Sequence, residues 1–92
     1  MTNDAALPRR RAELVVGELQ QGQETAILDP ATGHVVSLNP TAAAIWYLCD
    51  GNRDATVIAR ELLDAFPAAE PSQVEADVRA MLEQLAGLGL LA

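Results

Sequence analysis

The side chains that could do metal or nucleophilic chemistry are few, and their spacing keeps them apart. His34 is the only histidine and Cys49 is the only cysteine. A zinc site needs about three or four such ligands, and a cysteine nucleophile needs a base beside it. His34 directly follows a turn glycine, which predicts an exposed turn residue. Cys49 lies on the inward stripe of a predicted Ala-rich helix, which predicts a small buried side chain. We expect neither a metal site nor a covalent catalytic site.

The carboxylates and glycines also lack the patterns of an enzyme. Acid–base catalysis needs carboxylates that converge in one pocket. The acidic residues of the C-terminal half are instead scattered over predicted helix surfaces, at Glu61, Asp64, Glu75, Asp77 and Glu83. No GxxxxGK[ST] or GxGxxG sequence is present to hold a phosphate. Neither Ser37 nor Ser72 has the Asp-Ser-Leu-like context of an acyl carrier. The sequence predicts a protein that is not an enzyme and uses no cofactor.

Length and charge restrict the partners. The 92 residues form one small domain with one modest core. Thirteen acidic residues against six arginines and no lysine give a net charge of -7. This charge disfavours nucleic acid and anionic membranes, because affinity for phosphates comes from clustered basic side chains. The one dense positive cluster, Arg9–Arg11, is interpreted either as a solvated end or as an electrostatic handle for an acidic partner.

Further features of the sequence indicate the cellular compartment. No stretch approaches the ~20 apolar residues of a membrane span, and the N-terminus has no long apolar run. The single cysteine excludes an internal disulfide and suits a reducing environment. We expect a cytoplasmic protein.

Three strands and three helices must position these side chains. The predicted strands are 14–16, 24–28 and 35–38, and the predicted helices are 40–49, 54–66 and a third that begins near residue 72 and ends at about Gly87. We expect a flexible tail over residues 1–12 and a single domain over residues 13–92. Strands that precede helices favour an α+β domain. The order predicts a winged helix-turn-helix-like fold, with a three-stranded antiparallel sheet followed by three helices.

Local signals set the helix starts. Asn39 is a predicted N-cap with Pro40 at the first helical position, and the second helix starts near Asp54. The third helix has two candidate caps, Ser72 in a capping box with Glu75 or Glu70 followed by proline. The predicted inward side chains are Ala42, Ile45, Trp46 and Cys49, then Ile58, Leu62 and Phe66, then Val74, Val78, Met81, Leu82, Leu85 and Leu88, with Leu90 and Leu91 folding back onto the core.

The strand Val35–Leu38 is the predicted working surface. It is the last strand before the helices, and it contains neither lysine nor proline, which usually protect an unpaired edge. An open strand beside a helix is a template for the backbone of a partner peptide. The same edge could pair with a second copy of the chain and give a homodimer.

The order and spacing of several stretches resemble the PqqD family, the peptide chaperones of pyrroloquinoline quinone synthesis. This family is the prototype of the recognition elements for ribosomally made and modified peptides (RiPPs). The resemblance covers about Ile27 to the C-terminus. Its clearest parts are Val36–Asn39 followed by Ala44–Trp46, then Leu48–Gly51 (LCDG) and the DVxxML stretch at residues 77–82.

The resemblance implies a non-catalytic domain that binds the leader segment of a precursor peptide as an added strand. The domain then presents the precursor to a modifying enzyme, such as a radical S-adenosylmethionine enzyme or, in a lasso-peptide pathway, a separate leader protease and cyclase. The implied peptide-binding residues are Val35, Val36, Ser37 and Leu38 for the backbone ladder, Val78, Met81 and Leu85 for apolar contacts, and Arg79 as an ion-pair donor.

Two alternatives stay open. Val78 and Leu85 serve equally well as ordinary core residues, because an apolar helical stripe mostly serves packing. The fold is also compatible with a winged-helix transcriptional regulator. Against a regulator, the second and third helices offer only Arg60 and Arg79 among several acids, whereas a helix in the major groove needs basic and amide side chains.

Overall fold

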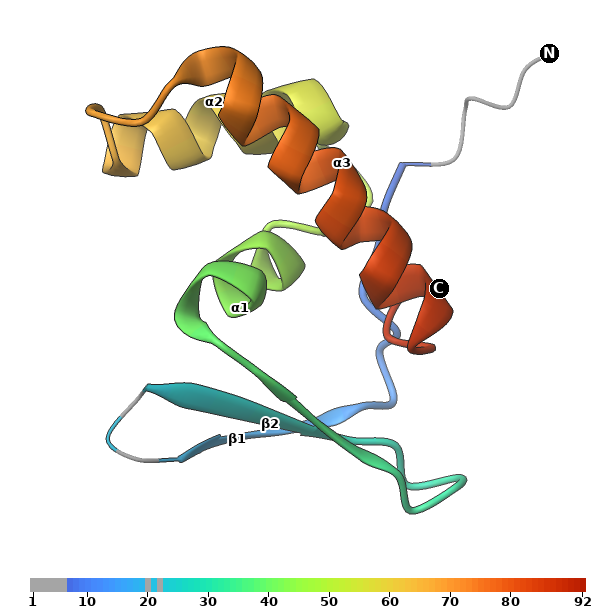
Figure 1. Ribbon diagram of the computed structural model, residues 1–92. Helices are drawn as coiled ribbons and strands as arrows, with labels where there is room; N and C mark the ends of the chain where they lie inside the picture. Colours follow the sequence, from blue (N-terminus) through green and yellow to red (C-terminus); the bar gives the residue numbers. More distant parts are fainter. Residues whose placement is uncertain (1–6, 20, 22) are drawn as a thin grey trace, which may run out of the picture.

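The computed structural model describes residues 7–19, 21 and 23–92. Its elements are β1 (Val15–Leu19), β2 (Glu24–Leu28), β3 (Val35–Leu38), α1 (Pro40–Tyr47), α2 (Ala55–Ala65) and α3 (Pro71–Gly87). The helices lie on one face of the sheet (Figure 1). This is the predicted α+β arrangement of three antiparallel strands followed by three helices. Within the described residues, none of the helices has the length and apolarity that a membrane span requires.

The sheet has the order β1-β2-β3 with antiparallel neighbours. Ile27 of β2 lies opposite Val16 of β1 and Val36 of β3. Strand β1 starts one residue later and extends further than predicted, because all five of its residues pair with β2. Both β1 and β3 are therefore edge strands among the described residues.

Capping residues fix the helix starts. The Asn39 side chain accepts a hydrogen bond from the Ala42 N–H at 2.8 Å, which confirms the predicted cap. The Asp54 side chain accepts one from the Val57 N–H at 2.9 Å, so the second helix starts near Asp54 as predicted, with Asp54 as its N-cap. The N-cap of α3 is Glu70, whose carboxylate accepts hydrogen bonds from the Ser72 and Gln73 N–H groups. The capping box at Ser72 is wrong. The preset φ of proline at the first helical position favours the earlier start.

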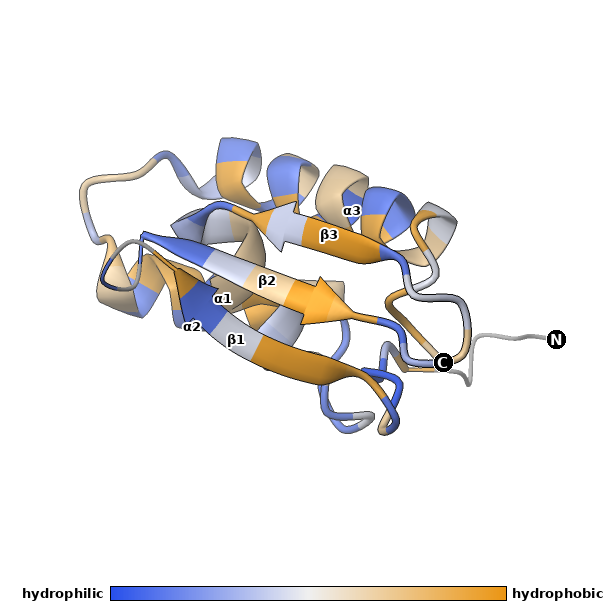
Figure 2. Cartoon of the chain, turned by 90° about the horizontal axis from the view of Figure 1, so that it is seen from below, coloured by the Kyte–Doolittle hydropathy of each residue, from blue (hydrophilic) through white to orange (hydrophobic). Residues whose placement is uncertain are grey.

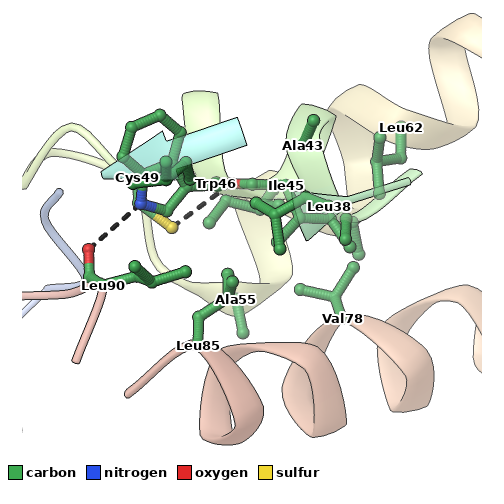
Figure 3. Packing of buried hydrophobic residues seen from close by; sticks show 14 residues of the cluster. Leu38, Ala43, Ile45, Trp46, Cys49, Ala55, Leu62, Val78, Leu85 and Leu90 are labelled. Carbon is green, nitrogen blue, oxygen red and sulfur yellow. Dashed lines mark hydrogen bonds between the residues drawn. The ribbon is translucent and has the colours of Figure 1, made fainter. Parts of the chain in front are cut away.

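The core lies between the sheet and the helices (Figure 3). Its buried side chains are Ile27, Leu38, Ala42, Ala43, Ile45, Trp46, Cys49, Ala55, Ile58, Ala59, Leu62, Val78, Leu85 and Leu90. The Trp46 Nε1–H donates to the Leu90 carbonyl at 3.0 Å and holds the C-terminal residues against α1, which confirms the predicted return of Leu90. Phe66 and Leu88 are 58% and 52% exposed, so their predicted burial is wrong. Both are C-cap residues just beyond a helix, where the inward stripe ends.

The segment before β1 differs from the expected flexible tail. Arg9 and Arg10 form isolated bridges with Asp50 and Leu91. The Arg10 N–H donates to the Cys49 carbonyl at 2.9 Å, and the Arg9 carbonyl accepts from the Ala92 N–H at 2.8 Å. These residues therefore join the end of α1 to the C-terminus. Residues 1–6 of the expected tail lie outside the described residues.

Candidate functional site

Strand β3 presents a free backbone edge. Among the described residues it pairs with β2 alone. The Asp29 N–H donates to the His34 carbonyl at 2.9 Å, which makes this a hydrogen-bonded pair next to the Leu28–Val35 pair. Because such pairs alternate along an antiparallel ladder, Val36 directs its N–H and C=O groups toward β2. The N–H and C=O groups of Val35 and Ser37 therefore point away from the sheet.

The side chains of β3 alternate between two faces. Leu38 is buried and Val36 is half-buried against the core. Val35 is 63% exposed, and Ser37 is exposed on the opposite face. The predicted binding strand is therefore an edge strand, but the Leu38 side chain serves the core and its backbone faces β2.

Helix α3 runs past the β3 edge of the sheet in the view from below (Figure 2), in the helix layer above the sheet (Figure 1). Two hollows lie toward the two ends of this arrangement. At the start of β3, a cavity of about 250 Å³ is lined by residues that include Thr32, His34 and Val36, together with Leu88 and Leu90 after α3. His34 is exposed there, as predicted for a turn residue.

The second hollow lies near the start of α1. It has a volume of about 190 Å³ and a mainly apolar lining that includes Thr41, Phe66, Val74 and Asp77. We call the open edge of β3, the facing side of α3 and these two hollows the β3–α3 groove. No pattern in the sequence marks Thr41, Asp77, Phe66 or Leu88 as residues of the site. Placing Phe66 and Leu88 just past the helix ends would have separated them from the core stripe.

The residues predicted on α3 divide over three sides of the helix. Met81 is half-buried and is seven positions from both Val74 and Leu88, so it shares their side, between the two hollows. Val78 and Leu85 are 0% exposed and point toward α1 (Figure 3). Their core interpretation is confirmed, and their side chains are unavailable to a peptide.

Arg79 faces away from the groove. Its guanidinium lies 2.7 Å from a Glu75 carboxylate oxygen and 3.3 Å from the Thr56 hydroxyl at the start of α2. The step of two residues from Arg79 to Met81 corresponds to about 200° of helix rotation. The structure therefore does not bring Arg79 to the edge of β3, and the same guanidinium holds the pKa of Glu75 below its ordinary value.

Arg11 fixes one end of the groove. Its Nη1 donates to the Gly89 carbonyl at 2.8 Å and lies 3.2 Å from an Asp29 carboxylate oxygen. It therefore ties the β2–β3 turn to the end of α3. A hydrogen bond from the Ala31 N–H, and then the charge of Arg11, lower the pKa of Asp29.

The residues considered for chemistry are placed as follows. Cys49 is fully buried, and burial raises the pKa of its thiol to about 11, which fits the core interpretation rather than a nucleophile. In the described part of the chain, no group of His, Cys, Asp and Glu side chains has a metal-binding arrangement. The groove can offer backbone hydrogen bonds, apolar contact and shallow side-chain cavities to a ligand.

Comparisons with known proteins place the chain in a family. The model of the family described as coenzyme PQQ synthesis protein D (PqqD) matches residues 24–91. No curated protein matches the chain.

Three solved structures share the fold. A lasso peptide synthetase B1 complexed with its leader peptide has a TM-score of 0.76 at 26% identity, over 95% of this chain and 99% of that chain. The PqqD truncation of Methylobacterium extorquens PqqCD, described as a stand-alone RiPP recognition element, has a TM-score of 0.73 at 27% identity, over 92% and 87%. TbiB1 in complex with the TbiA(beta) leader peptide has a TM-score of 0.72 at 24% identity, over 90% and 93%.

Proposed function

The chain belongs to the PqqD family, and from that premise we propose that it binds the leader segment of a ribosomally synthesised precursor peptide in the β3–α3 groove. The observation that carries the proposal is the free edge of β3 beside α3. The N–H and C=O groups of Val35 and Ser37 are the ones that an added strand would bond. Solved relatives described as bound to leader peptides support the same ligand class.

The length of the groove sets the length of the leader segment that it can bind. Val74 and Leu88 are 14 positions apart on or just beyond α3, which corresponds to about 21 Å of helix. An extended strand covers this distance in about six residues at about 3.3 Å each. We expect a leader segment of this length that places apolar side chains in the two hollows.

Backbone pairing and side-chain contacts have separate roles in this proposal. Main-chain bonds to β3 give affinity with little sequence preference, whereas the hollows and Met81 select the sequence. The flexible thioether of Met81 adapts to irregular shapes. The contact set therefore comprises the backbone of Val35 and Ser37 and the side chains of Met81, Val74 and Leu88, with Val78 and Leu85 supporting the groove from the core.

The bound precursor is then presented to a modifying enzyme. A quinone-type pathway would use a radical S-adenosylmethionine enzyme, and a lasso-type pathway would use a separate leader protease and cyclase. The chain itself contributes binding, and the chemistry belongs to that partner.

Calorimetric titration tests the function directly. The titrant is a synthetic peptide of the leader encoded by a precursor gene beside the gene of this chain, and the control is a scrambled peptide of the same composition. We expect saturable heat at tens of micromolar or below for the leader alone. No heat at that concentration, or equal heat from the scrambled peptide, would contradict the proposal.

The open edge of β3 also bears on self-association. A homodimer formed through this edge would occupy the groups that the leader needs. We therefore expect added leader to shift any dimer toward monomer in light scattering, because strand addition and self-pairing compete for the same groups.

The geometry does not favour the transcriptional regulator. The one arginine of α3, Arg79, is ion-paired with Glu75, and the helix also carries Asp77 and Glu83. Helix α3 thus offers no positive surface for DNA phosphates.

A further inference from the structure

A second surface lies at the opposite edge of the sheet. A cavity of about 510 Å³ opens beside β1, and its lining includes Arg9, Arg10, Val16, Tyr47 and Asp50. Strand β2 separates β1 from β3, so this cavity is distinct from the β3–α3 groove. We call it the arginine pocket.

Contacts within the chain hold Arg9 and Arg10 in place. The guanidinium of Arg10 lies 5.7 Å from the centre of the Trp46 ring and donates to the Tyr47 carbonyl at the end of α1. Arg9 packs over Gly51 so closely that a Cβ there would lie 2.7 Å from Arg9 Nε. Gly51 also has a φ of +84°, which favours glycine. The positive cluster is therefore a positioned part of the fold.

The three arginines at positions 9–11 differ in their ion pairs. Arg11 is paired with Glu13 and Asp29. Among the described residues, Arg9 and Arg10 form no ion pair with a carboxylate. Asp50 lines the pocket, but its carboxylate lies 2.7 Å from Arg53 Nη1. Among the described residues, these two positive charges therefore lie outside the ion pairs of a chain whose net charge is -7.

Apolar surface lies next to these charges. Tyr47 is 44% exposed and Val16 is 38% exposed. The partner of Val16 on β2 is Ile27, whose backbone N–H and C=O groups point toward β3. Because hydrogen-bonded pairs alternate along an antiparallel ladder, the N–H and C=O groups of Val16 point toward the open edge of β1. The pocket thus combines guanidinium donors, an aromatic side and a free strand edge.

From this combination we infer that the arginine pocket docks an acidic, extended segment of a partner protein. Its carboxylates bond Arg9 and Arg10, and its apolar side chains cover Tyr47 and Val16. A large polyanion such as nucleic acid is repelled by the net charge, whereas a short segment meets mainly the local field within a Debye length of about 8–10 Å. Docking at β1 leaves β3 free, so it does not depend on leader binding.

A designed peptide is the probe. The hexapeptide acetyl-Glu-Leu-Glu-Leu-Glu-Leu-amide places glutamates on one face of a strand and leucines on the other, and its Lys-Leu counterpart is the charge control. Both are titrated into the ¹⁵N-labelled full chain at about 0.1–0.15 M salt, where the Debye length is about 8–10 Å. We expect the acidic peptide to shift the amide signals of residues 9–11, Val16 and Tyr47, and the lysine peptide to leave them unchanged.

Matched variants complete the test. We expect R9Q/R10Q to weaken binding of the acidic peptide about tenfold, because the two substitutions together remove two exposed ion pairs with its carboxylates. R60Q/R79Q makes the same change in net charge on α2 and α3 and should bind like the original chain. If R9Q/R10Q does not fold, R9Q alone keeps the Arg10–Trp46 contact and should show a smaller loss. Shifts confined to β3 and α3, an equal response to the lysine peptide, or equal losses in both double variants would overturn the inference while leaving the leader titration unaffected.

Discussion

Replacing Ser37 with proline removes a backbone donor from the open edge of β3. The ladder register directs the hydrogen-bonding groups of Val36 and Leu38 toward β2, so the Ser37 N–H has no role within the sheet. Proline is tolerated in edge strands where the missing N–H faces outward. We therefore expect S37P to fold and to lose affinity for the leader.

The size of the loss follows from one missing hydrogen bond. A leader carbonyl that is covered but left without its donor costs about 1–3 kcal/mol. At about 1.4 kcal/mol for each tenfold change, the Kd should rise by about 5- to 150-fold. Calorimetric titration of the leader into S37P measures this ratio, and thermal unfolding verifies that the domain is intact.

Glu18 on β1 provides the matched control. It lies opposite Thr25, whose backbone bonds face Leu38 of β3, so the Glu18 N–H points to the other open edge. E18P introduces the same ring on an exposed edge strand and should leave leader affinity unchanged. Equal losses in E18P and S37P, or full affinity in a folded S37P, would refute strand addition at β3.

Three further predictions test the groove and its support. M81A should weaken leader binding by about 1 kcal/mol, or about fivefold, because part of an apolar contact is lost, whereas R79A should bind normally in the same titration. L85A should lower the free energy of unfolding by about 2–5 kcal/mol in urea, because it leaves a cavity in the core. The lowered pKa of Asp29 stabilises the fold above the pKa of the unfolded state, near 3.9, and this contribution is lost as the pH falls through the folded value. D29N should therefore reduce the slope of the free energy of unfolding against pH on the acid side. An unchanged slope would contradict this contribution of Asp29.

Features set by neighbouring residues could be predicted from the sequence. The cap at Asn39, the start of the second helix near Asp54 and the strand at 35–38 depend on local chemistry, and all are confirmed. The start of α3 has two candidates in the sequence, because Glu70 and Ser72 are both competent caps. The structure selects Glu70, and the preset φ of Pro71 at the first helical position favours this choice.

Features set by packing could not be predicted. The apolar stripe of α3 indicated one inward side, but its division between core and groove depends on where α1 and α2 lie. Val78 and Leu85 accordingly turn to the core, while Met81 stays at the groove. The pairing of Arg9 and Arg10 with Asp50 and Leu91 joins residues far apart in the chain, which no local pattern indicates.

Amide hydrogen exchange of β3 tests strand addition most directly. Exchange is measured for each residue with and without saturating leader, and the Glu18 and Val16 amides at the other edge serve as the internal reference. We expect the Val35 and Ser37 N–H groups to exchange quickly in the free chain and to become protected when the leader binds. Protection that appears at β1 instead, or leader binding that leaves Val35 and Ser37 exchanging as fast as before, would contradict strand addition at β3.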